Sequence, residues 1–303
     1  MLATAVVGTL AAAAVHPATA ATAHARRDTQ VGTFRVASFN VLGASHTPPG
    51  GKRAAGTTRI VWANRLLQRH HVDVAGFQEL QAPQLTAFLA INGSAWDVYP
   101  GLQLKKRDSE NSIGWRTDKF TLVSATTVNI PYFNGQSRAM PVVLLRDTAS
   151  GMLTYFSNFH NPADTSTYHH QQKWRVAASQ IEVALQNQLA ATGIPRVMTG
   201  DMNERADYFC RVTASANLKA ARPESYWHDG VCHANKPRAV DWILGSKRAT
   251  YSNYVEDRGP LVDKTTDHPV IVGTVSVTSD QLKNAFAPTD PAPVTPRKSW
   301  PLH

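Results

Sequence analysis

Residues that carry chemistry recur in this chain at the ends of short, apolar, strand-like runs. The runs cover 34–39, 74–77, 153–159, 196–199, 239–244 and 269–277. Loops at strand ends are where a rigid scaffold presents reactive side chains, so amides, carboxylates and imidazoles repeated there predict one shared site. Any one of them alone would be an ordinary turn former or cap. The set comprises Asn40, Glu79, His160, Asp201, Asn203, Asp241, Asp267 and His268.

Helical and strand-like patterns alternate along the chain. Apolar residues at helical spacing predict a helix with Ile60, Ala63 and Leu67 on one face, capped by Thr57 or Thr58. Further strands are expected at 120–130 and 141–146. Strands and helices mixed in this order predict an α/β sandwich. A second, longer helix carries Trp174, Ala178, Ile181, Leu185 and Leu189 at helical spacing.

Composition bounds the domain organisation and the class of partner. The chain has 303 residues, 43% hydrophobic and 17% charged, which suits one large domain with a buried core. We expect this domain at 31–278, followed by a flexible Pro-rich tail at 279–303. Lys and Arg outnumber Asp and Glu by 31 to 22, a net charge of +9. This charge suits a phosphate-bearing partner such as nucleic acid, an anionic membrane or a phosphorylated metabolite, although a generally basic soluble protein would share it.

The first 25 residues are typical of a signal peptide. They contain no Lys, Arg, Asp or Glu, and small-x-small sites follow the apolar stretch at 18–20 and 23–25. The basic n-region is missing, which points to a truncated start, and an Ala-rich disordered tail is the alternative. The stretch is too short for a convincing transmembrane helix, so we expect a secreted, extracellular protein. In an exported protein Cys210 and Cys232 suggest a disulfide, with metal ligation or catalysis as the alternatives.

Seven segments together resemble the endonuclease/exonuclease/phosphatase superfamily, which has the deoxyribonuclease-like fold. The segments SFNVLG, DVAGFQEL, NSIGWRTDKF, SNFHNPA, TGDMNERAD, AVDWIL and TTDHPVIVG follow the family order from Phe34 to Val277. The resemblance implies a four-layer sandwich of two sheets with the active site at one end. It also implies hydrolysis of a phosphate ester with the help of a divalent metal.

The resemblance assigns metal-site roles to Asn40 and Glu79, with Asp267 beside the metal. Mg²⁺ prefers carboxylate and amide oxygens, which these side chains supply. Mn²⁺ or Ca²⁺ would be alternative ions. Read alone, Glu79 would be a surface carboxylate and Asn40 a turn residue.

The resemblance also assigns roles in the reaction. Asp201 corresponds to the residue that activates water and Asn203 to the residue that orients the phosphate. Their i, i+2 spacing in an extended segment puts both on one face, although an Asx-turn before a helix would look the same. His160 and His268 would flank the phosphate as protonated donors, and Asp241 would orient His268.

Two weaker candidates for substrate binding are Asn111 and Arg138, which could equally be solvated loop residues. The segment 206–239, with both cysteines, is the least family-like and is expected to shape specificity. Leu42 replaces an acidic metal ligand of some base-excision nucleases, which disfavours repair of abasic sites.

The sequence therefore predicts a secreted, Mg²⁺-dependent phosphodiesterase, with nucleic acid as the favoured substrate. A sphingomyelinase-like lipid phosphodiesterase is an alternative, and 130–133 is its one candidate membrane loop. A phosphatase of small phosphate esters and a non-catalytic binding module on the same fold are the others. No obligate protein partner is indicated, and we expect a monomer.

Overall fold

The computed structural model describes residues 31–278 except 48–49 and 105. The predicted signal peptide at 1–25 and the predicted tail at 279–303 lie outside these residues. The elements in chain order are β1 (Val31–Asn40), η1 (Ala44–His46), α1 (Gly56–Arg69), β2 (Val74–Gln78), α2 (Ala82–Asn92), η2 (Gly93–Ala95), β3 (Trp96–Tyr99), η3 (Gly101–Gln103), α3 (Lys106–Ser109), β4 (Ser112–Arg116), β5 (Phe120–Pro131), η4 (Phe133–Gly135), β6 (Ser137–Asp147), β7 (Leu153–His160), α4 (Gln172–Ala190), β8 (Arg196–Asp201), α5 (Ala206–Ser215), β9 (Leu218–Ala220), β10 (Tyr226–His228), β11 (Val231–His233), β12 (Asp241–Ser246), β13 (Thr250–Asp257), α6 (Pro260–Thr265) and β14 (Val270–Thr278).

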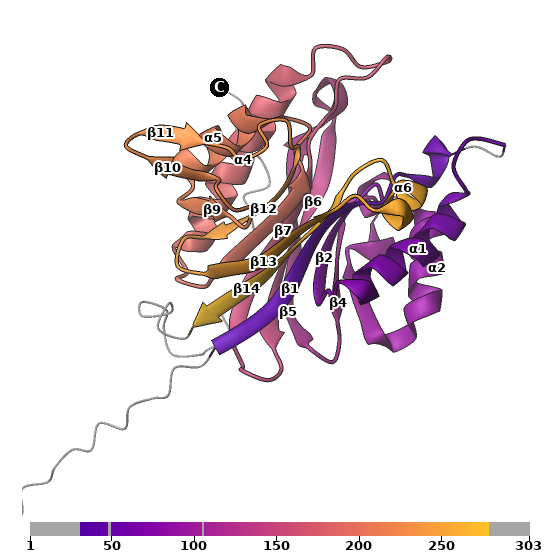
Figure 1. Ribbon diagram of the computed structural model, residues 1–303, viewed down its shortest axis with the longest axis horizontal. Helices are drawn as coiled ribbons and strands as arrows, with labels where there is room; N and C mark the ends of the chain where they lie inside the picture. The colour runs from indigo at the N-terminus through magenta and orange to yellow at the C-terminus, as the bar shows by residue number, and fades with distance from the viewer. Residues whose placement is uncertain (1–30, 48–49, 105, 279–303) are drawn as a thin grey trace, which may run out of the picture.

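Two six-stranded sheets face each other, and helices cover the outer face of each (Figure 1). The first sheet has the order β13-β14-β1-β2-β4-β3 and lies under α1, α2 and α6. The second has the order β5-β6-β7-β8-β12-β9 and lies under α4 and α5. The predicted α/β sandwich is therefore confirmed. Within the described ranges, no helix is long and apolar enough to cross a membrane.

Each sheet contains one parallel pair of strands, β1–β2 in the first and β7–β8 in the second. Asn40 pairs with Gln78 at the end of the first pair, and His160 pairs with Asp201 at the end of the second. The antiparallel strand β12 begins at Asp241, directly opposite Asp201. Polar residues at these strand ends therefore meet at one end of the sandwich.

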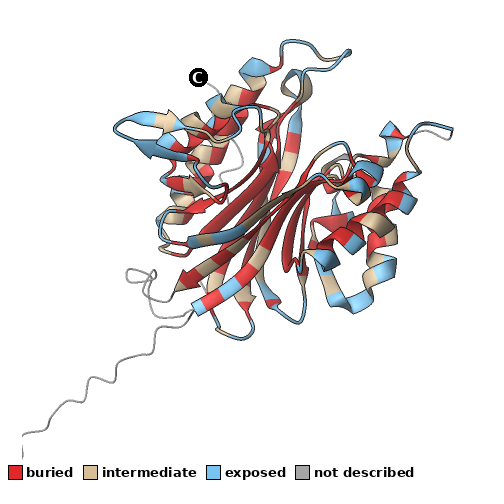
Figure 2. Cartoon of the chain, in the orientation of Figure 1, coloured by how far each residue is buried: buried red, intermediate tan, exposed pale blue. Residues whose placement is uncertain are grey.

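The faces that look into the space between the sheets change from apolar to polar toward that end. Phe34 and Phe156 pack edge to face in the apolar part, with ring centroids 5.4 Å apart. Further along, Gln78 Nε2 donates to Asn158 Oδ1 at 2.6 Å, and both side chains are buried. A Cβ at Gly76 would lie 1.9 Å from Thr199 Oγ1 and 2.6 Å from Asn158 Oδ1, so the glycine lets the sheets approach closely at this polar layer. Figure 2 shows that the central strands of both sheets are mostly buried, whereas the edge strand β13 is half-buried or exposed.

The helices bury the faces that their spacing predicts, but the predicted cap on α1 is wrong. Ile60, Ala63 and Leu67 are buried beneath α1. Neither Thr57 nor Thr58 caps the helix. The N-cap is Ala55, whose carbonyl accepts from the backbone N–H groups of Thr58 and Arg59, so both threonines lie inside the first turn. Along α4, Ala178, Leu185 and Leu189 are buried, whereas Trp174 and Ile181 are half-buried.

The predicted disulfide is present and joins Cys210 of α5 to Cys232 of β11. The two Cα atoms are 5.7 Å apart and 22 residues apart in sequence. This bond fixes the β10–β11 hairpin, which belongs to neither large sheet, to the outer helix layer. The cysteines are therefore structural, and neither ligates a metal.

Removing this bond should destabilise the protein. We expect the double variant Cys210→Ser/Cys232→Ser to lose about 3 kcal/mol of unfolding free energy, since a loop of this length no longer restricts the unfolded chain. Denaturant unfolding of the variant beside oxidised and reduced wild type measures the loss. Equal midpoints for oxidised wild type and the variant would show that the bond contributes nothing.

Candidate active site

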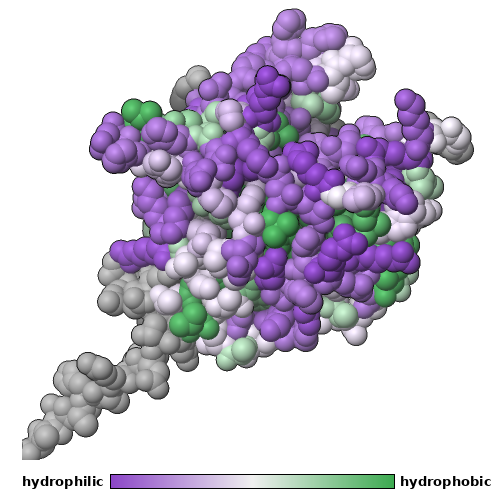
Figure 3. Space-filling view, in the orientation of Figure 1, coloured by the Kyte–Doolittle hydropathy of each residue, from purple (hydrophilic) through white to green (hydrophobic). Residues whose placement is uncertain are grey.

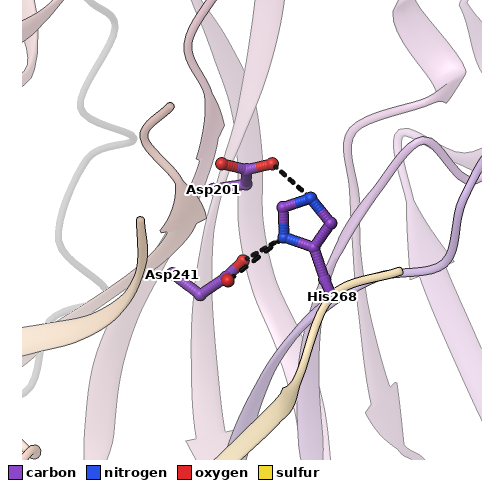
Figure 4. Close-up of side chains that lie close together, drawn as sticks. All are labelled: Asp201, Asp241 and His268. Carbon is purple, nitrogen blue, oxygen red and sulfur yellow. Dashed lines mark hydrogen bonds and ion pairs between the residues drawn. The ribbon is translucent and has the colours of Figure 1, made fainter. Parts of the chain in front are cut away.

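A carboxylate–imidazole–carboxylate arrangement lies at the polar end of the sandwich (Figure 4). His268 Nδ1 is 3.1 Å from both carboxylate oxygens of Asp241, the pairing expected from the sequence. His268 Nε2 is 3.5 Å from Asp201 Oδ2. The histidine precedes β14 of the first sheet, and both aspartates belong to the second, so the site exists only where the sheets face each other.

The surroundings of His268 favour its protonated form. Burial alone would lower its pKa, but Asp241 and Asp201 outweigh burial and raise the pKa to about 10. The imidazole is therefore a cation at neutral pH. A cation with one N–H directed into the site is suited to stabilising charge on a phosphoryl oxygen.

Asp201 is the most enclosed acid of the site, with 1% of its surface exposed. Burial raises its pKa, as does Asp241, against the opposing effect of His268 and His160. A carboxylate with a raised pKa is a better proton acceptor near neutral pH. Asp201 Oδ1 also accepts from the backbone N–H of Asn203 at 3.0 Å. The Asx-turn considered from the sequence is therefore present, and the other carboxylate oxygen still faces the histidines.

Asn203 continues from this turn in the left-handed region, with φ of 47°. Its side-chain Nδ2 donates to the backbone carbonyl of Asn161 at 2.9 Å, which fixes the amide close to the end of β7. An amide nitrogen has two hydrogens, so one N–H is left for a phosphoryl oxygen.

His160 differs from His268 in its charge state. Burial lowers the pKa of His160, against the opposing effect of Asp201 and Glu79. Tyr132 O–H lies 3.3 Å from Nδ1, and burial keeps the pKa of this hydroxyl raised, so it stays protonated and donates. Nε2, 3.6 Å from Asp201 Oδ2, then carries the imidazole proton. The expectation of two protonated histidines fits His268, and the surroundings of His160 favour a neutral ring.

Asn40 connects the two sheets across the site. Its Nδ2 donates to Glu79 Oε1 at 2.8 Å and to Asp201 Oδ2 at 3.1 Å. Its Oδ1 accepts from the backbone N–H of Leu42 at 3.0 Å. In this arrangement Asn40 positions two carboxylates, and its side-chain oxygen already accepts a hydrogen bond from the backbone of Leu42.

Glu79 remains anionic although it is mostly enclosed. Burial alone would raise its pKa, but His160 in its protonated form, the Gly43 N–H and Asn40 lower it. The Gly43 N–H donates to Oε2 at 2.8 Å. His46 Nε2 lies 3.5 Å from the same oxygen, on an exposed side chain that the sequence reasoning did not consider. The sequence clue to His46 was its position shortly after Asn40, where β1 ends.

The donor set fits a hard divalent cation. The site has more carboxylates than imidazoles. The carboxylates are those of Glu79, Asp201, Asp241 and Asp267. Mg²⁺, Mn²⁺ and Ca²⁺ prefer such oxygen donors. Asp201, Asp241 and His268 offer ligand atoms within 4.8 Å of one another, but they already bind each other. Of the four carboxylates, Glu79 is half-buried and Asp267 is exposed, so these two are the most accessible from solvent.

Two predicted substrate-binding residues turn out to be buried. Asn111 has no exposed surface, and neither amide atom has a hydrogen-bond partner among the described residues. An unpaired buried amide costs about 1–3 kcal/mol, so a ligand or a water molecule is needed there. Arg138 donates to Glu110 at 2.8 Å and lies 4.3 Å from the ring centre of Tyr132, which contacts His160. Neither is a solvated loop residue.

Arg59 is a structural residue that sequence reasoning missed. It is fully buried and donates to the carbonyls of Val41, Gly43 and Thr265. It therefore connects the loop after Asn40 to the loop that carries Asp267 and His268. The signal was available, because a charged residue stands four positions before Ala63 on the apolar face of α1.

A further buried acid, on α4, lies outside the group of residues that surrounds His268. Glu182 of α4 is fully buried and accepts from Tyr208 O–H, while its Oε1 has no partner among the described residues. Burial raises the pKa of Glu182 to about 7. Because the folded pKa exceeds the unfolded value of 4.5, this group favours the folded state below pH 4.5 and loses that contribution as pH rises through 7.

We therefore expect Glu182→Gln to gain stability over wild type as pH rises from 5 to 8. The relative gain should be on the order of 3 kcal/mol, since glutamine does not ionise. Denaturant unfolding at both pH values provides the measurement, with the exposed Glu224→Gln as the matched control. A Glu182→Gln curve parallel to wild type across this range would refute the raised pKa.

Solved structures share this fold. An endonuclease/exonuclease/phosphatase family protein of Bacteroides thetaiotaomicron has a TM-score of 0.63 and 18% identity, covering 83% of this chain and 97% of that one. The catalytic domain of human nocturnin has a TM-score of 0.64 and 16% identity, covering 83% and 98%. The mannosyl-6-phosphatase of Bacteroides thetaiotaomicron has a TM-score of 0.61 and 18% identity, covering 80% and 99%. No curated protein matched the chain.

The model of the endonuclease/exonuclease/phosphatase family matches residues 37–268, which include the end of β1 and all of β2, β7 and β8, and the match ends on His268. Members of this superfamily are phosphoester hydrolases. The chain belongs to the endonuclease/exonuclease/phosphatase family.

Proposed function

We propose that the protein is a secreted, divalent-metal-dependent phosphodiesterase that hydrolyses nucleic acid. The observation that carries the proposal is the position of His268 between Asp241 and Asp201. One carboxylate keeps the imidazole charged, and the other, whose pKa is raised, is available to accept a proton. Phosphoester hydrolysis needs a positively charged donor and a base at one phosphate.

The chain's own groups divide the reaction between them. Asp201 accepts a proton from the attacking water as the water oxygen bonds to phosphorus and the bond from phosphorus to the leaving oxygen breaks. The leaving oxygen takes up a proton from solvent. His268 donates to a phosphoryl oxygen, and the free N–H of Asn203 orients the phosphate. The Nε2–H of His160 donates to a second phosphoryl oxygen. A cation bound by Glu79 and Asp267 would neutralise charge on the phosphate.

Nucleic acid is preferred over lipid because of charge and exposure. The net charge of +9 suits a polyanion. The one candidate membrane loop, 130–133, does not offer an apolar surface, since Ile130, Pro131 and Tyr132 are all buried. The apolar residues at 2–15 and the disulfide support export. A structural neighbour named as a mannosyl-6-phosphatase is a reason to include a phosphomonoester among the test substrates.

Removal of either reactive group should abolish most activity. We expect Asp201→Asn and His268→Ala each to lower kcat/KM at least about a thousandfold, roughly 4 kcal/mol of transition-state stabilisation. Initial rates on plasmid DNA, single-stranded RNA, sphingomyelin and a generic phosphomonoester provide the measurement. The exposed Asp97→Asn and His71→Ala are matched controls and should retain wild-type rates. Activity on sphingomyelin alone would exclude the nuclease assignment.

Metal dependence can be tested separately. A chelator should abolish hydrolysis and excess Mg²⁺ should restore it, because the carboxylates alone cannot neutralise a phosphate. Glu79→Gln should raise the Mg²⁺ concentration for half-maximal activity at least about tenfold, the effect of losing one anionic ligand. Rates that persist in chelator would contradict a metal-dependent mechanism.

A further inference from the structure

The β10–β11 hairpin presents an aromatic surface outside the sandwich. Tyr226 pairs with His233 and His228 with Val231, so these four side chains share one face of the hairpin. Tyr226 is 51% exposed and Val231 is 55% exposed. The rings of Tyr226 and His233 stack, with centroids 5.1 Å apart and planes 27° apart. Figure 3 shows a hydrophobic spot on this hairpin within a largely hydrophilic face.

A groove of about 690 Å³ lies between this hairpin and the start of α5. We call it the hairpin groove. Ala206 and Pro237 line one part of it, Tyr226 and His233 another, and Glu224 and Asn235 add polar groups to its wall. The Cys210–Cys232 disulfide, also in the wall, fixes the hairpin against α5. The disulfide therefore fixes the two walls of the groove relative to each other.

The hairpin groove continues from the catalytic strands. Asp201 and Asp241 face each other in the β8–β12 ladder, and the next backbone bond runs from the Met202 N–H to the Val240 carbonyl at 2.9 Å. The Ala206 N–H then donates to the Pro237 carbonyl at 3.1 Å. Because Ala206 and Pro237 line the groove, it begins a few residues beyond the two catalytic aspartates.

Exposed cations lie on the two segments that join the groove to β8 and to β12. Arg205 directly precedes α5, and Arg238 stands between the groove and Asp241. Both are exposed, and no ion pair of either is present among the described residues. Lys236, also exposed, is already paired with Glu256 at 3.2 Å. Two exposed guanidinium groups on the connections that join the groove to the strands of Asp201 and Asp241 suit a polyanion that bears planar groups.

We propose that the hairpin groove is a base-binding subsite for single-stranded nucleic acid. A nucleobase next to the scissile phosphate stacks on the Tyr226–His233 pair, and Arg205 and Arg238 contact neighbouring phosphates. Glu224 and Asn235 match the polar edges of a base and would be poor neighbours for an acyl chain. Base faces are accessible only in single strands, since a duplex keeps them stacked. The inference rests on the proposed nuclease function and names its substrate class.

Binding measured in chelator tests the subsite without catalysis. Fluorescence anisotropy follows a labelled oligothymidylate and an abasic oligomer of equal length. Tyr226→Ala should weaken oligothymidylate binding at least about tenfold, the usual effect of losing one base-stacking ring. Its binding of the abasic oligomer should equal that of wild type. Tyr226→Phe should bind normally, because the ring and not the hydroxyl stacks.

A matched control removes exposed apolar surface elsewhere. Leu122 is 43% exposed and pairs with Leu145, at the opposite end of the second sheet from His160. Leu122→Ala should bind both oligomers as wild type does. Unchanged oligothymidylate binding by Tyr226→Ala, or an equal loss on both oligomers, would overturn the proposal. So would a Tyr226→Ala or Val231→Ala defect confined to co-sedimentation with anionic phosphatidylglycerol vesicles, which would identify a membrane contact.

Hydrolysis of bis(p-nitrophenyl) phosphate with Mg²⁺ separates failure of the subsite from failure of the proposed function. This small diester reaches the phosphate site without needing the groove, so Tyr226→Ala should hydrolyse it at the wild-type rate. Wild type that is inactive on every diester but binds oligothymidylate through Tyr226 would refute the nuclease and leave the subsite standing. If wild type hydrolyses the diester and Tyr226→Ala binds oligothymidylate as wild type does, the subsite alone would be refuted.

Discussion

The single parallel strand pair in each sheet is the constraint on which the rest of the structure depends. Parallel strands end at the same edge, so β1–β2 delivers Asn40 and Glu79 together and β7–β8 delivers His160 and Asp201 together. The sheets then face each other with these edges at one end of the sandwich (Figure 1). The site is assembled by the ends of strands that also form the core, which makes its geometry as rigid as the core itself.

Placing several charges at this end is costly, and the contacts around them limit the cost. Buried carboxylates are tolerated only when hydrogen bonds or opposite charges surround them. Asn40 donates to two of them, backbone N–H groups donate to Glu79 and Asp201, and His268 lies between Asp201 and Asp241. The two histidines differ in charge because their surroundings differ. His268, between two carboxylates, is held charged, whereas burial and the Tyr132 hydroxyl favour a neutral His160.

The segment 206–239 connects two neighbouring strands of the second sheet, β8 and β12. It carries the disulfide and the β10–β11 hairpin, and it leaves and rejoins the sheet within a few residues of Asp201 and Asp241. The Cys210–Cys232 bond holds the hairpin against α5, outside the two large sheets. The candidate active site is therefore built by the two large sheets, and the β10–β11 hairpin lies apart from them.

The sequence by itself determined the alternation of strands and helices and the residue types at the strand ends, because a period of two or 3.6 is a local property. It missed β9, which has only three residues, and β10 and β13, in which no residue is buried and no apolar pattern results. It also placed the start of α1 too late, since backbone packing and not a threonine hydroxyl sets it. Only the tertiary structure decided which sheet each polar end belongs to, that Arg59 joins two loops, and which histidine is charged. These depend on burial and on neighbours distant in the chain, which no local pattern records.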